Sequence, residues 1–208
     1  MSSPARQIDT IMRTAPVIPV IVIEDAAHAE PLARALVAGG LPVLEVTLRT
    51  PAALDAIRAM KAVPGAIVGA GTVTNEAELD AALDAGSEFI VAPGLTETLG
   101  HAAIREGVPF LPGVASAGDI MRGLDLGLTH FKFFPAMAAG GLPALKALAP
   151  PFGQCLFCPT GGITPDNAAE WLAFDPVLCV GGSWVAPKGA PDEARIERLA
   201  RAAAGLRA

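Results

Sequence analysis

Short apolar runs alternate with alanine-rich stretches along the whole chain, and this alternation constrains the fold more than any other feature. The runs have the length and composition of buried strands, and the longer stretches have the composition of helices. We predict strands at 17–23, 43–47, 67–70, 89–92, 110–112, 130–133, 156–158 and 178–181. We predict helices at 26–38, 51–60, 75–85, 96–106, 117–126, 142–148, 165–172 and 192–206, with one more before the first strand at 5–14. Eight strand–helix pairs predict an α/β fold, a (β/α)8 TIM barrel in which residues 1–208 form a single domain.

The main structural alternative is a doubly wound open sheet, which also alternates strands and helices. A Rossmann glycine fingerprint is absent from the first predicted strand–helix turn, where the chain has Glu24-Asp25-Ala26. Glycines stand instead where predicted helices end, at Gly39-Gly40, Gly86, Gly107 and Gly127, as is typical of helix C-caps. No linker or low-complexity tract divides the chain, so we favour the barrel.

The composition argues against several classes of protein. Hydrophobic residues make up 52% of the 208 residues and charged residues 17%, which excludes a disordered chain and supplies a large core. The net charge of −6 and the lack of a basic stretch argue against nucleic-acid binding. The apolar stretches are too short to span a membrane, and residues 1–14 lack the pattern of a signal peptide. We therefore expect a cytoplasmic protein.

The three cysteines, Cys155, Cys158 and Cys179, do not form a disulfide framework. The first two match C-x-x-C, the spacing of a redox pair or of half a zinc site. However, there is no second C-x-x-C and no histidine close by, and residues three apart in a strand point to opposite faces. We therefore expect reduced thiols and predict neither a metal site nor a redox site.

Lys132 lies inside an apolar run, 130–135, of which we predict 130–133 to be a strand. An unpaired ammonium group is costly to bury, and burial favours the neutral amine, which is a nucleophile. Such an amine can form a Schiff base with a carbonyl substrate. The structural alternatives are a lysine paired with a carboxylate and a lysine that reaches water from a strand end. His130 and Phe134 share the face of Lys132, and we interpret His130 as structural.

Three polar residues alternate along the second predicted strand and just beyond it: Glu45, Thr47 and Arg49. In extended chain they share one face, which departs from the apolar pattern of a buried parallel strand. Active sites of such barrels lie at the C-terminal ends of the strands. We therefore predict that Glu45 is an acid/base and that Arg49 holds a substrate carboxylate with its planar fork. An internal ion pair between Glu45 and Arg49 is the structural alternative.

Glycine and proline mark the ends of the other predicted strands. Gly69-Ala70-Gly71-Thr72 combines close backbone approach with a hydroxyl group, and Ala92-Pro93-Gly94 is chiefly a turn and secondarily a pocket wall. Thr160-Gly161-Gly162 follows the seventh strand, and Gly181-Gly182-Ser183 ends the eighth. Backbone N–H groups in such turns bind phosphate, and this fold often binds it after strands seven and eight. The two turns together predict a phosphate site across the barrel mouth from Arg49.

Seven segments, in order and without a large insertion between them, match the pattern of one enzyme family. They are 16–21 (PVIPVI), 44–50 (LEVTLRT), 68–73 (VGAGTV), 93–96 (PGLT), 131–136 (FKFFPA), 158–163 (CPTGGI) and 181–184 (GGSW). On these segments the chain resembles the bacterial 2-keto-3-deoxy-6-phosphogluconate (KDPG) and 4-hydroxy-2-oxoglutarate (KHG) aldolases. The resemblance implies a class I aldolase, with neither metal nor cofactor, that cleaves KDPG to pyruvate and glyceraldehyde 3-phosphate. Cleavage of KHG to pyruvate and glyoxylate is a further activity it suggests.

The same resemblance implies a role for each matching residue. Lys132 would form the Schiff base and Glu45 would transfer protons, while Arg49 and Thr72 would hold the carboxylate end of the substrate. The remaining assignments are Gly161, Gly162 and Ser183 for the phosphate, and Pro93, Phe134 and Thr160 for the walls of the site. Family members commonly form homotrimers, and the apolar composition agrees with such contacts.

Two residues depart from the family pattern: Met137, where many relatives carry an acid, and Ala92, where serine is frequent. The preference among KDPG, its galactonate epimer and KHG therefore stays open. Three other functions remain as alternatives: an isomerase or epimerase with Glu45 as base, a non-catalytic phospho-ligand binder, and a zinc-dependent aldolase. The spacing of the histidines, His28, His101 and His130, disfavours the zinc enzyme.

Overall fold

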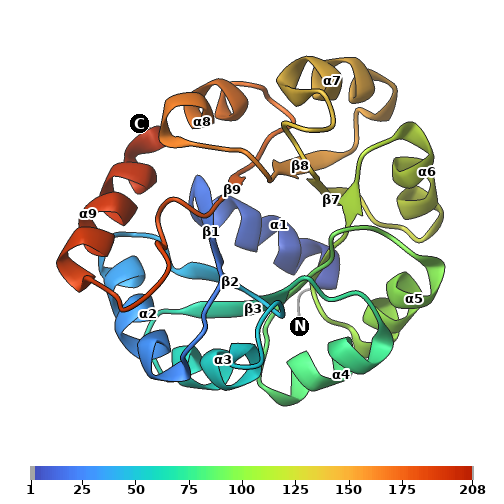
Figure 1. Ribbon diagram of the computed structural model, residues 1–208. Helices are drawn as coiled ribbons and strands as arrows, with labels where there is room; N and C mark the ends of the chain where they lie inside the picture. The colour runs from blue at the N-terminus through green and yellow to red at the C-terminus, as the bar shows by residue number, and fades with distance from the viewer. Residues whose placement is uncertain (1–2, 208) are drawn as a thin grey trace.

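The computed structural model describes residues 3–207, and its helices surround a set of short parallel strands (Figure 1). The strands are β1 (Val17–Ile21), β2 (Val43–Thr47), β3 (Ile67–Gly71), β4 (Ile90–Val91), β5 (Phe110–Leu111), β6 (Gly113–Val114), β7 (His130–Phe133), β8 (Leu156–Pro159) and β9 (Val180–Gly182). Six of them form one sheet in the order β5-β4-β3-β2-β1-β9, and three form a second in the order β6-β7-β8. Every pairing is parallel, so the predicted α/β fold is confirmed.

The α-helices largely follow the predicted ranges. They are α1 (Pro4–Thr14), α2 (Ala29–Ala38), α3 (Ala53–Lys61), α4 (Glu76–Asp84), α5 (Glu97–Glu106), α6 (Ala117–Asp125), α7 (Gly141–Leu148), α8 (Pro165–Leu172) and α9 (Glu193–Ala204). Short 3-10 helices cover Ala26–His28, Pro150–Phe152 and Gly205–Arg207. The predicted N-terminal helix is confirmed, and it begins at Pro4 with Ser3 as its N-cap. Within residues 3–207, no helix has both the length and the apolar composition needed to cross a membrane.

The predicted strand boundaries fail chiefly at the fifth strand. The predicted strand 110–112 ends one residue early, at Leu111, because Pro112 has no N–H with which to continue the hydrogen-bond ladder, and β6 at Gly113–Val114 was not predicted. The carbonyl of Pro112 still accepts a hydrogen bond from the backbone N–H of Lys132, at 2.8 Å. Pairing also ends earlier than predicted in β1, at Ile21, and begins later than predicted in β9, at Val180.

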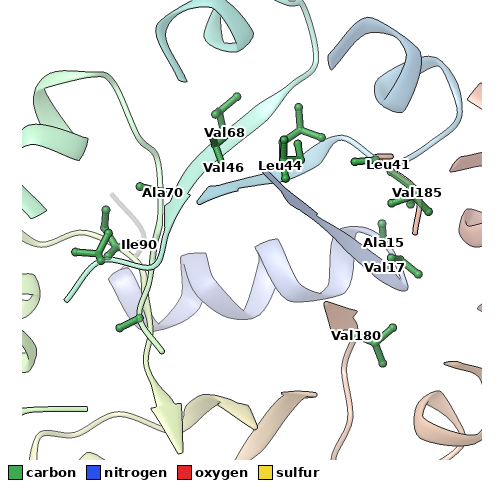
Figure 2. Close-up of a cluster of buried hydrophobic side chains, with 14 of the residues drawn as sticks. Ala15, Val17, Leu41, Leu44, Val46, Val68, Ala70, Ile90, Val180 and Val185 are labelled. Atoms are coloured by element: carbon green, nitrogen blue, oxygen red, sulfur yellow. The ribbon is translucent and has the colours of Figure 1, made fainter. Parts of the chain in front are cut away.

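Alternate residues of each strand face two separate apolar clusters. The outer cluster fills the space between the strands and the surrounding helices, and Figure 2 shows part of it, including Leu44, Val46, Val68 and Ala70. The inner cluster lies between the strands and α1. Its members are Ile8, Ile11 and Met12 of α1 with Ile18, Val43, Phe89, Val91, Leu111, Cys158, Leu178 and Cys179. This period-2 pattern decides which polar side chains point inward.

Helix α1 covers the end of the inner cluster at which the strands begin. At that end, Nε2 of His130, the first residue of β7, lies 3.1 Å from Oδ1 of Asp9 in α1. His130 is buried, and its Nδ1 lies 3.2 Å from the hydroxyl of Thr129. These contacts agree with the structural role predicted for His130. The opposite end, where the strands finish, is therefore the end at which polar side chains can meet a ligand.

Candidate active site

Lys132 and Glu45 meet in the interior enclosed by the strands. Lys132 comes from the middle of β7 and Glu45 from the middle of β2, and the two residues lie in different sheets. Nζ of Lys132 donates a hydrogen bond to Oε1 of Glu45 at 2.9 Å. The residues are only 5% and 3% exposed, respectively. The prediction that both side chains point inward is confirmed, and the lysine does have a carboxylate partner.

The alternative ion pair between Glu45 and Arg49 is wrong. β2 ends at Thr47, so the alternation of faces stops there and Arg49 lies in the following turn. Arg49 is exposed and makes no ion pair with any residue in 3–207. Thr47 is buried, and its hydroxyl donates to the carbonyl of Ile21 at 2.7 Å. Thr47 therefore ties β2 to β1, and the guanidinium of Arg49 is free to bind an anion.

The surroundings of Lys132 combine an aromatic ring with small side chains. Its Nζ lies 5.4 Å from the centroid of the Phe134 ring, within the range of a cation–π contact. Its neighbours in the adjacent strands are Gly113 of β6 and Cys158 of β8. A Cβ atom on Gly113 would collide with the backbone carbonyl of Pro93. Pro93 is thus packed against the strand beside Lys132, as expected for a wall of the site.

Thr72 follows β3 directly and has an unusual backbone conformation. Its φ of 62° makes it the one non-glycine residue with positive φ in residues 3–207. A residue with a Cβ atom adopts this conformation at a cost of about 1–2 kcal/mol. Strain of this kind is concentrated at functional sites, so the observation supports a binding role for the half-buried Thr72.

The glycine-rich turn after β8 lies beside the glycine-rich end of β9. Thr160 forms a parallel bridge with Gly181, and a Cβ atom on Gly181 would collide with the Thr160 side chain. Thr160 is buried, and its hydroxyl lies 3.4 Å from the carbonyl of Cys158. Gly161 and Gly162 both have positive φ, 102° and 79°, which favours glycine at each position.

Ser183 and Met137 lie at the edge of these turns. Ser183 is exposed immediately after β9, and its hydroxyl makes no hydrogen bond within residues 3–207. The backbone N–H of Met137 donates to the carbonyl of Gly161 at 3.0 Å, and the Met137 side chain lies beside Gly162. Of the two residues that depart from the family pattern, Met137 therefore borders the predicted phosphate site. The other, Ala92, is buried.

Cys155 and Cys158 belong to different clusters, and only Cys158 lies in β8, because Cys155 immediately precedes that strand. Cys155 packs in the outer cluster, where burial raises the pKa of its thiol, and Cys158 packs in the inner cluster. All three cysteines are buried, and none of them forms a disulfide within residues 3–207. The two cysteines of the C-x-x-C segment therefore pack in separate parts of the core.

Sequence reasoning interpreted Gly71 as room for a ligand and Gly113 as chiefly part of a turn, and it did not predict which side chains they contact. Gly113 faces Lys132 in the neighbouring strand, and Gly71 lies against the side chain of Glu45. Strand register is the signal that identifies them, and a single sequence does not contain it.

Comparison with known proteins agrees with this geometry. A family model for KDPG and KHG aldolases matches residues 8–199. The chain is 61% identical over 202 residues to the 2-dehydro-3-deoxy-phosphogluconate aldolase of Zymomonas mobilis, covering 97% of each protein. A crystal structure of the 2-keto-3-deoxy-6-phosphogluconate aldolase of Zymomonas mobilis with 3-phosphoglycerate has a TM-score of 0.96 at 61% identity, covering 98% of this chain and 97% of that one.

A second solved structure carries a reaction intermediate. It is a KDPG aldolase from Legionella pneumophila with pyruvate captured as a covalent carbinolamine intermediate. The present chain is 45% identical to it, with a TM-score of 0.92, and the comparison covers 96% of this chain and 98% of that one.

Proposed function

The chain belongs to the KDPG and KHG aldolase family, and we propose that it is a class I aldolase acting through a Schiff base on Lys132. Its substrate is KDPG, cleaved to pyruvate and glyceraldehyde 3-phosphate, and it also cleaves KHG to pyruvate and glyoxylate. The observation that carries the proposal is the buried contact of 2.9 Å between Lys132 Nζ and Glu45 Oε1. An amine nucleophile and a proton acceptor are within direct transfer distance.

Glu45 handles the protons of imine formation. Its carboxylate accepts a proton from the Lys132 ammonium, and the neutral amine attacks the C2 carbonyl of the substrate. The carbinolamine then loses its hydroxyl group as water, with the proton supplied by Glu45, and a protonated imine remains. One carboxylate serves both steps because it alternates between base and acid.

The protonated imine accepts the electron pair of the breaking C3–C4 bond. The Glu45 carboxylate removes the proton from the C4 hydroxyl, the aldehyde leaves, and an enamine remains on Lys132. Glu45 protonates the enamine at C3, and hydrolysis of the resulting pyruvate imine regenerates the amine. Each proton that Glu45 receives is returned within one turnover, so the residue ends in its initial state.

The remaining site residues bind the two ends of the substrate. Arg49 and Thr72, at the ends of neighbouring strands β2 and β3, hold the carboxylate. Gly161, Gly162 and Ser183 hold the phosphate, and Pro93, Phe134 and Thr160 line the space between. Support for the phosphate site comes from the adjacency of the two glycine-rich turns and from the 3-phosphoglycerate in the Zymomonas structure.

The same family membership supports a closed (β/α)8 barrel formed by residues 1–208 as one domain. Thr160 and Phe157 bridge to Gly181 and Val177, which links the three-stranded sheet to the six-stranded sheet. On the other side, only Pro112 separates β5 from β6. The hydrogen-bond ladder is interrupted only locally between β8 and β9 and between β5 and β6. Both interruptions are therefore compatible with a closed barrel.

We further propose a cytoplasmic homotrimer. Three large hydrophobic side chains, Ile104, Met121 and Met137, are about half exposed, between 46% and 57%, which supports contacts with other copies. Light scattering after size-exclusion chromatography tests this assembly. A monomeric mass across the micromolar range would contradict it.

Trapping with borohydride tests the covalent mechanism. Incubation with pyruvate and borohydride should add a reduced pyruvyl group, and peptide mapping should locate it on Lys132. The Lys132→Ala variant should gain no mass under the same conditions. If pyruvate binds to the native chain without forming an adduct, the chain is instead a cofactor-free enzyme that uses Glu45 as its base.

A further inference from the structure

Gly71, the last residue of β3, lies directly against the carboxylate of Glu45. A Cβ atom on Gly71 would be 2.6 Å from Cγ and 2.8 Å from Cδ of Glu45, and it would collide with Oε1. Oε1 is the atom that contacts Lys132 Nζ. Non-bonded carbon atoms prefer separations of about 3.5–4.0 Å. We propose that Gly71 is a positioning residue, whose missing side chain leaves the space in which the Glu45 carboxylate reaches Lys132.

The backbone at position 71 gives no other reason for a glycine. Gly71 pairs with Thr47 in the ladder between β2 and β3, and its carbonyl accepts from the N–H of Leu48 at 2.8 Å. It is not among the glycines with positive φ, so other residues can adopt its conformation. The space occupied by Glu45 is therefore the feature that excludes a side chain.

The conflict caused by a side chain at position 71 would be resolved by Glu45. The three atoms nearest to the added Cβ all belong to the Glu45 side chain, which has rotatable bonds, whereas the backbone of β3 is held by its ladder. The fold should therefore survive, with the carboxylate displaced from Lys132. Proton transfer needs a separation of about 2.6–3.2 Å, and a displacement of about 1 Å can lower a rate roughly 100-fold.

At two other inward-facing glycines, an added Cβ atom would meet atoms other than those of Glu45. Gly69 precedes Gly71 on the same strand face, but a Cβ there would meet the Phe89 ring at 2.6 Å. Gly113 faces Lys132, but a Cβ there would meet backbone atoms, including Gly94 N at 2.7 Å. Substitution of Gly69 thus disturbs packing, and substitution of Gly113 disturbs backbone placement. Only substitution of Gly71 acts on the carboxylate.

The inference rests on the proposed proton-transfer role of Glu45, and its test compares Gly71→Ala with Gly69→Ala. We expect Gly71→Ala to lower kcat for KDPG about 100-fold while KM changes less than about threefold. Exchange of the pyruvate methyl protons with deuterated water should slow by a similar factor, since Glu45 moves those protons. The matched Gly69→Ala variant should lose thermal stability but retain kcat. If folded Gly71→Ala keeps kcat and the exchange rate within about twofold of the native values, the inference is wrong.

A double variant separates a steric conflict from general damage. The additional change Glu45→Ala, combined with Gly71→Ala, removes all three side-chain atoms that an added Cβ at position 71 would meet, so the two kcat losses should not multiply. If they do multiply, Gly71 does not act through Glu45. If Gly71→Ala fails to fold but the double variant folds, the result supports a steric conflict with Glu45. If both variants fail to fold, the added Cβ disrupts the backbone and the inference is wrong. Failure of the native chain to form a pyruvate adduct would instead contradict the proposed function itself.

Discussion

Glu45 and Lys132 are 87 residues apart in sequence, yet their side chains form a hydrogen bond of 2.9 Å between two different sheets. Both groups are buried, so each charge depends on the other for compensation. The contact also joins the proposed nucleophile to its proton acceptor. Stability of the fold and chemistry at the site are therefore coupled through a single pair.

Removal of the lysine should affect both properties. We expect Lys132→Ala to abolish aldol cleavage and to destabilise the fold by about 3–5 kcal/mol, because Glu45 loses its buried partner. The second change Glu45→Gln, combined with Lys132→Ala, should recover part of the lost stability but none of the activity. Urea unfolding and KDPG cleavage assays on the same samples measure the two effects. Full stability of Lys132→Ala alone would show that Glu45 does not rely on Lys132.

Replacement of the carboxylate should slow imine formation without removing the nucleophile. Glu45→Gln keeps the shape of the side chain but cannot accept a proton, so kcat should fall by about 10²–10⁴-fold. Pyruvate should still be trapped on Lys132 by borohydride, but at a lower rate. Rapid-quench mass spectrometry follows this rate, and an unchanged rate of trapping would assign proton transfer to another group.

Thr72 offers a direct comparison of strain with binding. Thr72→Gly should remove the strain of the left-handed backbone conformation. The free energy of unfolding should then rise by up to about 1 kcal/mol, after the entropy cost of glycine is subtracted. Loss of the hydroxyl should raise KM for both KDPG and KHG, because both carry the carboxylate. Thr72→Ser retains the hydroxyl and serves as the control. A KM that is unchanged in Thr72→Gly would remove Thr72 from the carboxylate site.

Ser183 should distinguish phosphorylated from unphosphorylated substrates. A hydrogen bond to a charged group contributes about 1.5–3 kcal/mol, so Ser183→Ala should lower kcat/KM for KDPG by about 10-fold or more. KHG has no phosphate, and its kcat/KM should change less than about twofold. Steady-state kinetics on both substrates provide the measurement. Equal losses on the two substrates would contradict the phosphate assignment.

Asp9 should make the attachment of α1 dependent on pH. Its pKa lies below the ordinary value of 3.8, because hydrogen bonds from Arg13 and His130 outweigh the opposing effect of burial. A lowered carboxyl pKa stabilises the fold above that ordinary value, and the contribution is lost as pH falls through the lowered pKa. The thermal midpoint of Asp9→Asn should therefore lie below that of the native chain at about pH 7, with the gap narrowing toward about pH 3. A gap of constant size would assign the effect to packing.

The amino-acid sequence alone determined the strand and helix pattern and the faces on which Glu45 and Lys132 lie. Periodicity decides both, because alternate residues of a strand point to opposite sides wherever that strand is placed. The range 130–133 was predicted with its observed boundaries for this reason. Pro112 shows the limit of the method, since it was predicted to end a strand, whereas the chain is interrupted at Pro112 and continues as β6 at Gly113–Val114.

Only the tertiary structure decided which inward-facing residues meet. The pairing of Glu45 with Lys132 rather than Arg49 depends on where β2 ends and on which strands face each other across the interior. The contact of Gly71 with Glu45 depends on the register between β2 and β3, to which local propensity contributes nothing. Residues far apart in the chain become neighbours through the packing of all the strands around one interior, and that packing is a property of the whole molecule.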